Sequence, residues 1–228
     1  MSPERTAELI SRLHAAPLRG VLAVTGGGSG AISQLLGTPG ASRTVLEAVV
    51  PYARPALDEW LGGSVDSACS ERAARAMAVA AMQRACRLEG VEESDDLDRS
   101  ADLFGLGCTA SLASDRPKRG DHRLHVAVQT ATATQCWSLK LEKGARSRAE
   151  EEAVAAELIV HALAHAAGLD DAAFEPADGD TLTVREKLAP PLWQAMLWGD
   201  GLTALIDPSQ DRNDYTVKPR CERVLLPG

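Results

Sequence analysis

Apolar residues near the start of the chain recur first with the period of a helix and then in the short runs typical of strands. Residues 3–16 place Leu9, Ile10 and Leu13 on one face, behind a Ser-Pro start that suits a helix N-terminus. The apolar run GVLAVTG follows, then GGSG, and then AISQLL, which returns to helical spacing. This order predicts a strand, a glycine turn and a helix, which together form half of a βαβ unit.

The next segments continue the alternation of strand and helix. Residues 44–50, TVLEAVV, are apolar and β-branched enough to predict a buried strand, and Pro55 suits the first turn of a short helix. Residues 66–88 are rich in alanine and predict a long core helix capped by Asp66 or Ser67. The acidic stretch 89–102 has almost no large apolar residue, so we expect a solvated loop there.

The second half of the chain predicts more strands and one more long helix. Strands are expected at 103–112, 123–130 and 134–142, and the last two alternate as antiparallel strands do. Residues 148–169 predict a helix that stops at Gly168. The fold class is therefore α/β with a mixed sheet in a domain of residues 1–170. Residues 171–228 are turn-rich, with one apolar patch from Trp193 to Trp198, and are expected to form a connector or annex.

Charge and composition narrow the class of protein. The 228 residues include 24 basic and 32 acidic side chains, a net charge of −8 that argues against nonspecific binding to nucleic acid. No apolar run approaches the roughly 20 residues of a membrane helix, and no secretory signal opens the chain, so we expect a cytoplasmic protein. The five cysteines are widely spaced, which favours reduced, structural thiols over a zinc or redox site.

A glycine-rich turn after the first strand is the first candidate for chemistry. Its residues are Thr25, Gly26, Gly27, Gly28 and Ser29. Glycines let the backbone approach a ligand, and the free N–H groups at a helix start favour a phosphate or a carboxylate. The segment matches neither a Walker A sequence nor the dinucleotide fingerprint. A tight strand-to-helix turn without a ligand is the alternative.

A basic segment and a histidine pair are the other candidates. Residues 116–123 carry four cationic side chains, Arg119 before Gly120 among them, and Arg146 and Arg148 follow. This segment binds an anion or forms a solvated hairpin paired with carboxylates. His161 and His165 are spaced to share a metal ion, but HALAH lacks the glutamate of a HExxH motif. We expect ordinary structural histidines, no metal and no cofactor.

Several short motifs, in order, resemble the C-terminal domain of the CinA family. They are Thr25-Gly26-Gly27, Pro39-Gly40-Ala41-Ser42, Val49-Val50-Pro51-Tyr52, Met77-Ala78, the segment from Thr109 to Ala113, the basic turn ending at Gly120, and Gly144-Ala145-Arg146. The likeness spans about residues 5–168. It implies a three-layer α/β/α sandwich that commonly forms oligomers.

Active members of this family are nicotinamide-nucleotide amidases, and the resemblance implies catalytic positions. Ser42 stands where the family has its nucleophile, and Tyr52 where it has the assisting tyrosine. The position of the family lysine holds Leu57, and that of a family glutamate holds Leu22. Because a serine hydroxyl needs a base to attack, we expect amidase activity to be weak or lost. In the alternative interpretation, the Ser42 hydroxyl only caps a turn.

The resemblance also suggests ligands and partners. We expect a domain that binds a pyridine nucleotide such as nicotinamide mononucleotide, or a similar phosphorylated small molecule, through the glycine turn, Thr109, Arg119, Gly120 and Arg146. An active amidohydrolase and a regulatory or oligomerising module with a vestigial pocket are the alternatives. The sequences of these motifs are similar to those of a branch of the family that is fused ahead of a nucleotidylyltransferase domain. Residues 171–228 are therefore expected to lead into such a domain. A homo-oligomer is also expected.

Overall fold

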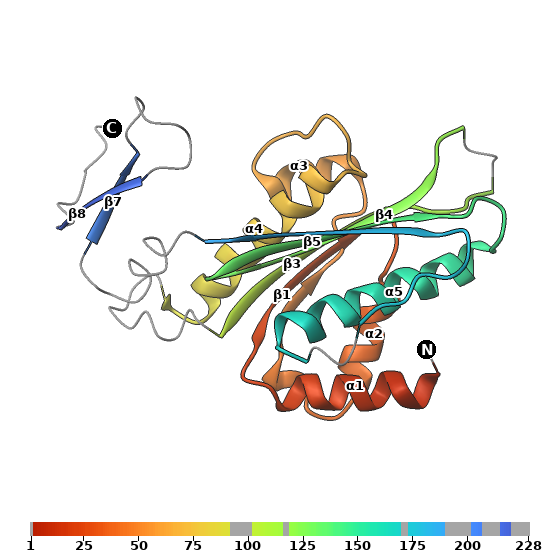
Figure 1. Ribbon diagram of the computed structural model, residues 1–228, viewed down its shortest axis with the longest axis horizontal. Helices are drawn as coiled ribbons and strands as arrows, with labels where there is room; N and C mark the ends of the chain where they lie inside the picture. The colour runs from red at the N-terminus through yellow and green to blue at the C-terminus, as the bar shows by residue number, and fades with distance from the viewer. Residues whose placement is uncertain are drawn as a thin grey trace.

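A computed structural model shows a mixed six-stranded sheet between two layers of helices (Figure 1). It describes residues 2–91, 102–115, 119–169 and 173–189, together with the backbone of 202–206 and 215–219. The helices are α1 (Pro3–Ala15), α2 (Gly30–Gly37), α3 (Arg54–Leu61), α4 (Glu71–Leu88) and α5 (Arg148–Ala166), with a 3₁₀ turn, η1, at Ala41–Arg43. The strands of the sheet are β1 (Arg19–Thr25), β2 (Val45–Val49), β3 (Leu103–Ser111), β4 (His122–Thr130), β5 (Ala133–Leu141) and β6 (Thr181–Leu188).

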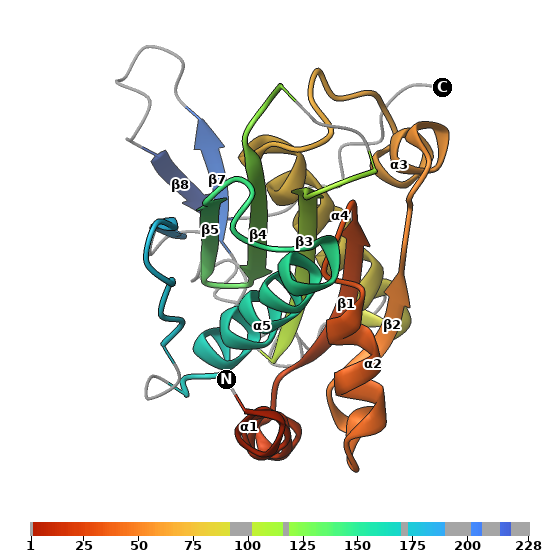
Figure 2. The same ribbon diagram turned by 90° about the vertical axis from the view of Figure 1, so that its right-hand side faces the viewer.

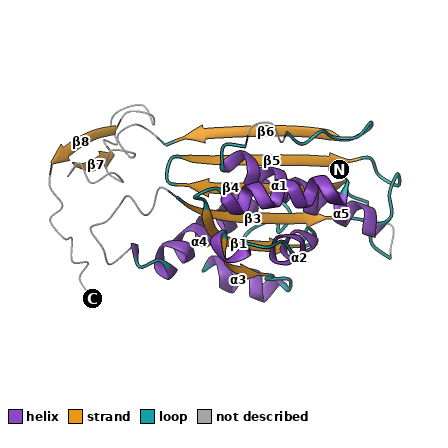
Figure 3. Ribbon diagram, turned by 90° about the horizontal axis from the view of Figure 1, so that it is seen from below, coloured by secondary structure: helices purple, strands orange, loops and turns teal. Residues whose placement is uncertain are grey.

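The strand order is β2-β1-β3-β4-β5-β6, and the sheet changes direction at its centre. β2, β1 and β3 are parallel, whereas β3, β4, β5 and β6 pair antiparallel. Figure 3 looks onto the face covered by α1, α2 and α5, and α3 and α4 cover the opposite face. This arrangement confirms the predicted three-layer α/β/α sandwich with a mixed sheet.

β6 extends the sheet beyond the region where the sequence placed the domain. Residues 181–188, expected to belong to the annex, pair with β5 along its whole length. The carboxyl-terminal strands β7 (Leu202–Ile206) and β8 (Tyr215–Pro219) pair with each other in a separate two-stranded sheet. The Trp193–Trp198 patch and most of the acidic loop lie outside the described residues.

Small residues bring α4 close to the sheet. A Cβ atom on Gly105 or Gly107 would lie 2.1 Å from backbone atoms of α4, so only glycine allows this approach. The helix meets them with alanines that are fully buried, Ala74 and Ala78 among them. Its N-cap is Ser70, whose hydroxyl accepts from the Ala73 N–H, rather than Asp66 or Ser67. The close packing explains the alanine-rich sequence that predicted a core helix.

β2 differs from its expectation as a buried strand. All five of its residues are partly exposed because β2 lies at the edge of the sheet. α5, by contrast, is deeply buried and begins with a capping box between Ser147 and Glu150. The described residues contain no helix that is long and apolar enough to cross a membrane.

Candidate functional site

The glycine turn is a compact link from β1 to α2. Gly26 and Gly28 have φ angles of +77° and +93°, which side chains rarely tolerate. A Cβ atom on Gly26 would also lie 2.0 Å from the Ala110 carbonyl oxygen of β3. The glycines are therefore required by the turn itself, as the interpretation without a ligand predicts.

The donors of the turn nevertheless converge on a negative charge, which the chain supplies itself. Glu152 Oε1 accepts from the backbone N–H of Gly28 at 2.9 Å, the hydroxyl of Ser29 at 3.1 Å and the N–H of Gly30 at 3.3 Å. These are the donors that the sequence assigned to an external anion. A carboxylate oxygen from α5 thus occupies the position predicted for a phosphate oxygen.

Arg148 supports this arrangement from one helical turn earlier on α5. Its guanidinium donates to the Gly26 carbonyl oxygen at 3.0 Å and lies 3.5 Å from the second Glu152 oxygen. Burial acts to raise the pKa of Glu152. Hydrogen bonds from Gly28, Gly30 and Ser29 and the charge of Arg148 outweigh it, so the pKa falls below its ordinary value of 4.5. Glu152 is therefore ionised at neutral pH.

The neighbouring Glu151 fastens a second loop to the same end of α5. Its fully buried carboxylate accepts from the Ala113 N–H at 2.6 Å and lies 2.6 Å from His122 Nδ1. Two consecutive glutamates thus hold the loops that follow β1 and β3. These loops leave the carboxyl ends of neighbouring parallel strands, where open α/β sheets bind ligands.

The other residues predicted to bind the ligand do not meet at Glu152. Arg146 forms two hydrogen bonds of 2.9 Å with Asp180, and these raise the pKa of its guanidinium. Arg119 is exposed, and the Gly120 carbonyl oxygen accepts from Lys143. Arg116 and Lys118 lie outside the described residues. Arg146 is thus held by a carboxylate of its own chain.

Two threonines of the predicted site also point elsewhere. Thr25 donates to the Pro51 carbonyl oxygen at 3.0 Å, toward β2. Thr109 is fully buried and its hydroxyl lies 3.4 Å from the carbonyl oxygen of Ser70, the N-cap of α4. It therefore lies on the opposite face of the sheet from α5 and Glu152. Of the residues predicted to bind a ligand, Gly28 and Ser29 converge on one point.

Ser42 and Tyr52 lie at opposite ends of β2. Ser42 belongs to η1, before the strand, and Tyr52 lies between the strand and α3. Figure 2 shows α2 near one end of β2 and α3 near the other. At about 3.3 Å per residue, the strand alone spans roughly 13 Å, so the two hydroxyls cannot touch within one chain. Both residues are exposed, Tyr52 by 70%.

No base stands ready for Ser42 in its own loop. His14 is fully buried nearby, but its two ring nitrogens already contact Thr44 Oγ1 at 2.9 Å and the Leu35 carbonyl oxygen at 3.0 Å. Arg43 donates to the His14 carbonyl oxygen. At the position of the family lysine, Leu57 is 2% exposed and packs with Ala23 and Met77. The Leu57 side chain therefore points into the core and not toward solvent.

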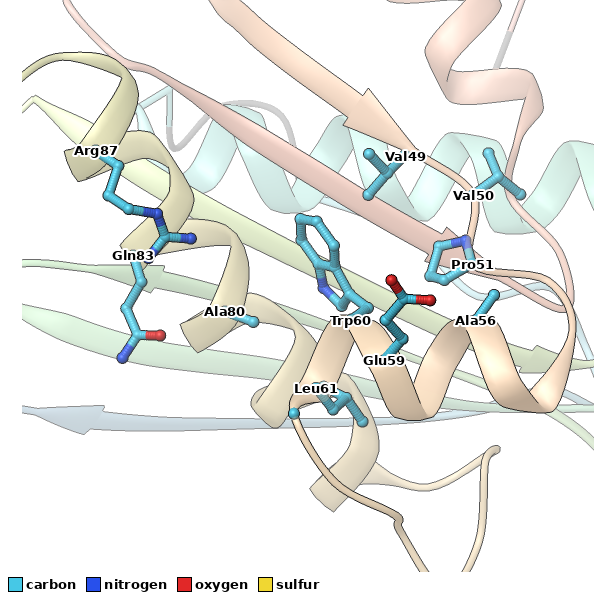
Figure 4. A pocket seen from close by; sticks show the side chains of 11 residues that line it. Val49, Val50, Pro51, Ala56, Glu59, Trp60, Leu61, Ala80, Gln83 and Arg87 are labelled. Carbon is cyan, nitrogen blue, oxygen red and sulfur yellow. The ribbon is translucent and has the colours of Figure 1, made fainter.

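A separate hollow of about 600 Å³ opens beside the carboxyl end of β2, between α3 and α4 (Figure 4). Val49, Pro51 and Ala80 contribute apolar walls, and Trp60 stands between them. Glu59 and Arg87 add charges of opposite sign. This hollow could not be recognised from the sequence, because its walls come from three elements that no local motif connects.

The histidines of α5 have structural partners. His161 lies 3.7 Å from a Glu157 oxygen and packs edge-on against Phe174, while His165 packs edge-on against Trp137. Across the part of the chain that the structure describes, no three His, Cys, Asp or Glu side chains are grouped to hold a metal ion. Within the described residues, His161 and His165 therefore do not belong to a group of three metal-ligating side chains.

Comparison with solved structures identifies the architecture. The competence/damage-inducible protein CihA from Agrobacterium tumefaciens matches 75% of this chain over 99% of its own, at 18% identity and a TM-score of 0.51. A CinA superfamily protein from Klebsiella pneumoniae matches 74% of this chain over 99% of its own, at 13% identity and a TM-score of 0.54. Neither a protein-family model nor a curated protein sequence matches the chain. The likeness shows that this chain has a CinA-like fold.

Proposed function

We propose that this CinA-like domain has lost amidase activity and binds a phosphorylated small molecule, such as a pyridine nucleotide, in competition with its own Glu152. The observation that carries the proposal is the single carboxylate oxygen that receives three donors from the glycine turn. The same donors suit a phosphate oxygen in charge, size and distance. Glu152 then acts as an internal anion that a ligand must displace.

The loss of amidase activity rests on the three catalytic positions that the resemblance implies. Ser42 and Tyr52 lie at opposite ends of β2, and Leu57 is buried where the family has a lysine. General-base assistance typically contributes about 10²–10⁴-fold to a rate. Without a base, release of ammonia from nicotinamide mononucleotide falls below detection.

An internal carboxylate predicts weak binding of external phosphate. Glu152 is attached to α5 and always present, so a ligand gains only the difference between its own contacts and those of Glu152. The Glu152→Gln variant removes the charge while keeping the shape. It therefore binds phosphate more tightly than the native protein, and binding weakens with salt in both.

Thermal unfolding with inorganic phosphate, nicotinamide mononucleotide and nicotinate mononucleotide tests the proposal. If the variant binds phosphate with a Kd of about 1 mM, 10 mM phosphate stabilises it by roughly 1.4 kcal/mol, a shift of about 3–6 °C. The native protein shifts less. Glu175→Gln, which removes an exposed charge with no role in the turn, is the matched control and behaves as the native protein does.

A regulatory or oligomerising module with a vestigial pocket is the second candidate, because Glu152 already satisfies the turn. The two candidates differ in the outcome of the same experiment. If none of the three ligands shifts the melting temperature of the native protein or of Glu152→Gln, the turn has only a structural role. That result replaces the ligand-binding proposal with the regulatory one.

A further inference from the structure

We infer that the hollow beside Trp60 is a second binding site, separate from the glycine turn, for a flat aromatic molecule that carries an anionic group. The hollow measures about 600 Å³ and lies at the carboxyl end of β2, on the face of the sheet covered by α3 and α4. This volume is in the range of sites that take small organic ligands. Glu152 lies on the opposite face, so the two sites are independent.

The walls select a flat, apolar body. Val49, Pro51, Ala56 and Ala80 are apolar and short, and the indole of Trp60 stands among them (Figure 4). An aromatic ring gains both apolar burial and stacking against an indole. Small side chains around one large ring leave space for a planar ligand, whereas a bulky aliphatic group fits the same space less well.

The charged groups define the two ends of the ligand. Arg87 and Gln83 project from α4 on one side of Trp60, and Glu59 projects from α3 on the other (Figure 4). A guanidinium favours a carboxylate or phosphate, and a carboxylate favours an N–H donor or a positive charge. The best ligand therefore has an anion at one end and a donor at the other.

Trp60 itself supplies an independent observation. Its indole N–H is buried and has no acceptor among the described residues. A buried donor without an acceptor is unfavourable, and such groups are rare in native proteins. A ligand or a water molecule admitted to the hollow by a small movement of α3 provides the missing acceptor. The linker Gly62-Gly63, which follows α3 directly, allows such a movement.

Nuclear magnetic resonance of the indole N–H groups tests the inference on the full chain. Four tryptophans give four indole signals, and Trp60→Phe identifies the signal of Trp60 by its loss. The probes are 4-aminobenzoate, which has both end groups, benzoate, which lacks the donor, and aniline, which lacks the anion. We expect 4-aminobenzoate to move the Trp60 signal at the lowest concentration.

Two arginine variants separate recognition from general charge effects. Arg87→Ala should weaken the binding of 4-aminobenzoate by about fivefold or more, because an anion loses its charge-assisted hydrogen bond. Arg75→Ala, which removes an exposed arginine elsewhere on α4, should leave binding unchanged. Unchanged positions of the other indole signals show that each variant is folded.

The outcomes distinguish this inference from the proposed function. Glu152→Gln should change the response to phosphate and leave the response of Trp60 to 4-aminobenzoate as in the native protein. If no probe moves the Trp60 signal, or if Arg75→Ala and Arg87→Ala weaken binding equally, the hollow is not the site described here. Either result leaves the proposal for the glycine turn standing.

Discussion

The substitution Glu152→Gln should lower the stability of the protein in a way that depends on pH. Glutamine keeps the shape of the side chain but removes the charge that three donors and Arg148 face. A hydrogen bond to a charged group contributes roughly 1.5–3 kcal/mol and a neutral one roughly 0.5–1.5 kcal/mol. Three such differences reach about 3 kcal/mol, and because Glu152 is 24% exposed, solvent screening reduces this to about 1–2 kcal/mol.

Thermal unfolding over a range of pH measures this effect. A loss of about 1–2 kcal/mol corresponds to a fall of roughly 2–8 °C in Tm for a chain of this size. Because the pKa of Glu152 is depressed in the folded state, its contribution is present above its ordinary pKa of 4.5 and is lost as pH falls through the lower folded value. The difference in Tm between native protein and variant is therefore full near pH 7 and disappears in acid.

Two results would contradict a stabilising role for the charge of Glu152. If Glu152→Gln melts at the native temperature at pH 7, the hydrogen bonds to the turn contribute no net stability. A difference that stays constant from pH 7 down to pH 3 would show that the charge of Glu152 is not responsible. Glu175→Gln provides the comparison, since the loss of an exposed carboxylate should change Tm very little.

Three further substitutions test the fold and its ion pairs. Leu57→Lys should lower the free energy of unfolding by about 3 kcal/mol or more, because it buries a charge at a position that is 2% exposed. Denaturant unfolding measures the loss, with Leu57→Met as the control, and unchanged stability would contradict the buried placement. Gly107→Ala should prevent the close packing of α4 and lower Tm by about 5 °C or more, whereas a native Tm would show that the helix can move away freely. A double-mutant cycle of Arg146→Ala and Asp180→Ala should give a coupling of about 1–3 kcal/mol, and a coupling near zero would show that the pair is not formed in solution.

Elements with strong local patterns could be predicted from the sequence, and elements defined by distant partners could not. The glycine turn, the alanine-rich α4 and the alternating strands β4 and β5 all appear near their predicted positions. β6 was missed because an edge strand has no strict alternation of buried and exposed positions, and five of its eight residues are charged or polar. It pairs with β5, whose residues lie about forty to fifty-five positions earlier in the sequence.

The candidate site shows the same limit. The turn was identified as an anion site from its local geometry, but its anion, Glu152, lies more than 120 residues away in the sequence. Asp180 is also distant in the sequence from the arginine it binds, 34 positions after Arg146. The local sequence shows which N–H and hydroxyl donors the glycine turn contains. The packing of α5 against the sheet determines which carboxylate accepts from them. Three consecutive glutamates, Glu150, Glu151 and Glu152, follow closely on the start of α5, and they were the local signal of this carboxylate.

Release of ammonia from nicotinamide mononucleotide is the measurement that tests the proposed loss of amidase activity. The assay compares the native protein with Ser42→Ala at millimolar substrate, and it follows ammonia rather than binding. We expect no release above background from either protein, because Ser42 has no base in its loop and Leu57 is buried. Robust turnover by the native protein that disappears in Ser42→Ala would contradict it and identify the chain as an active amidase.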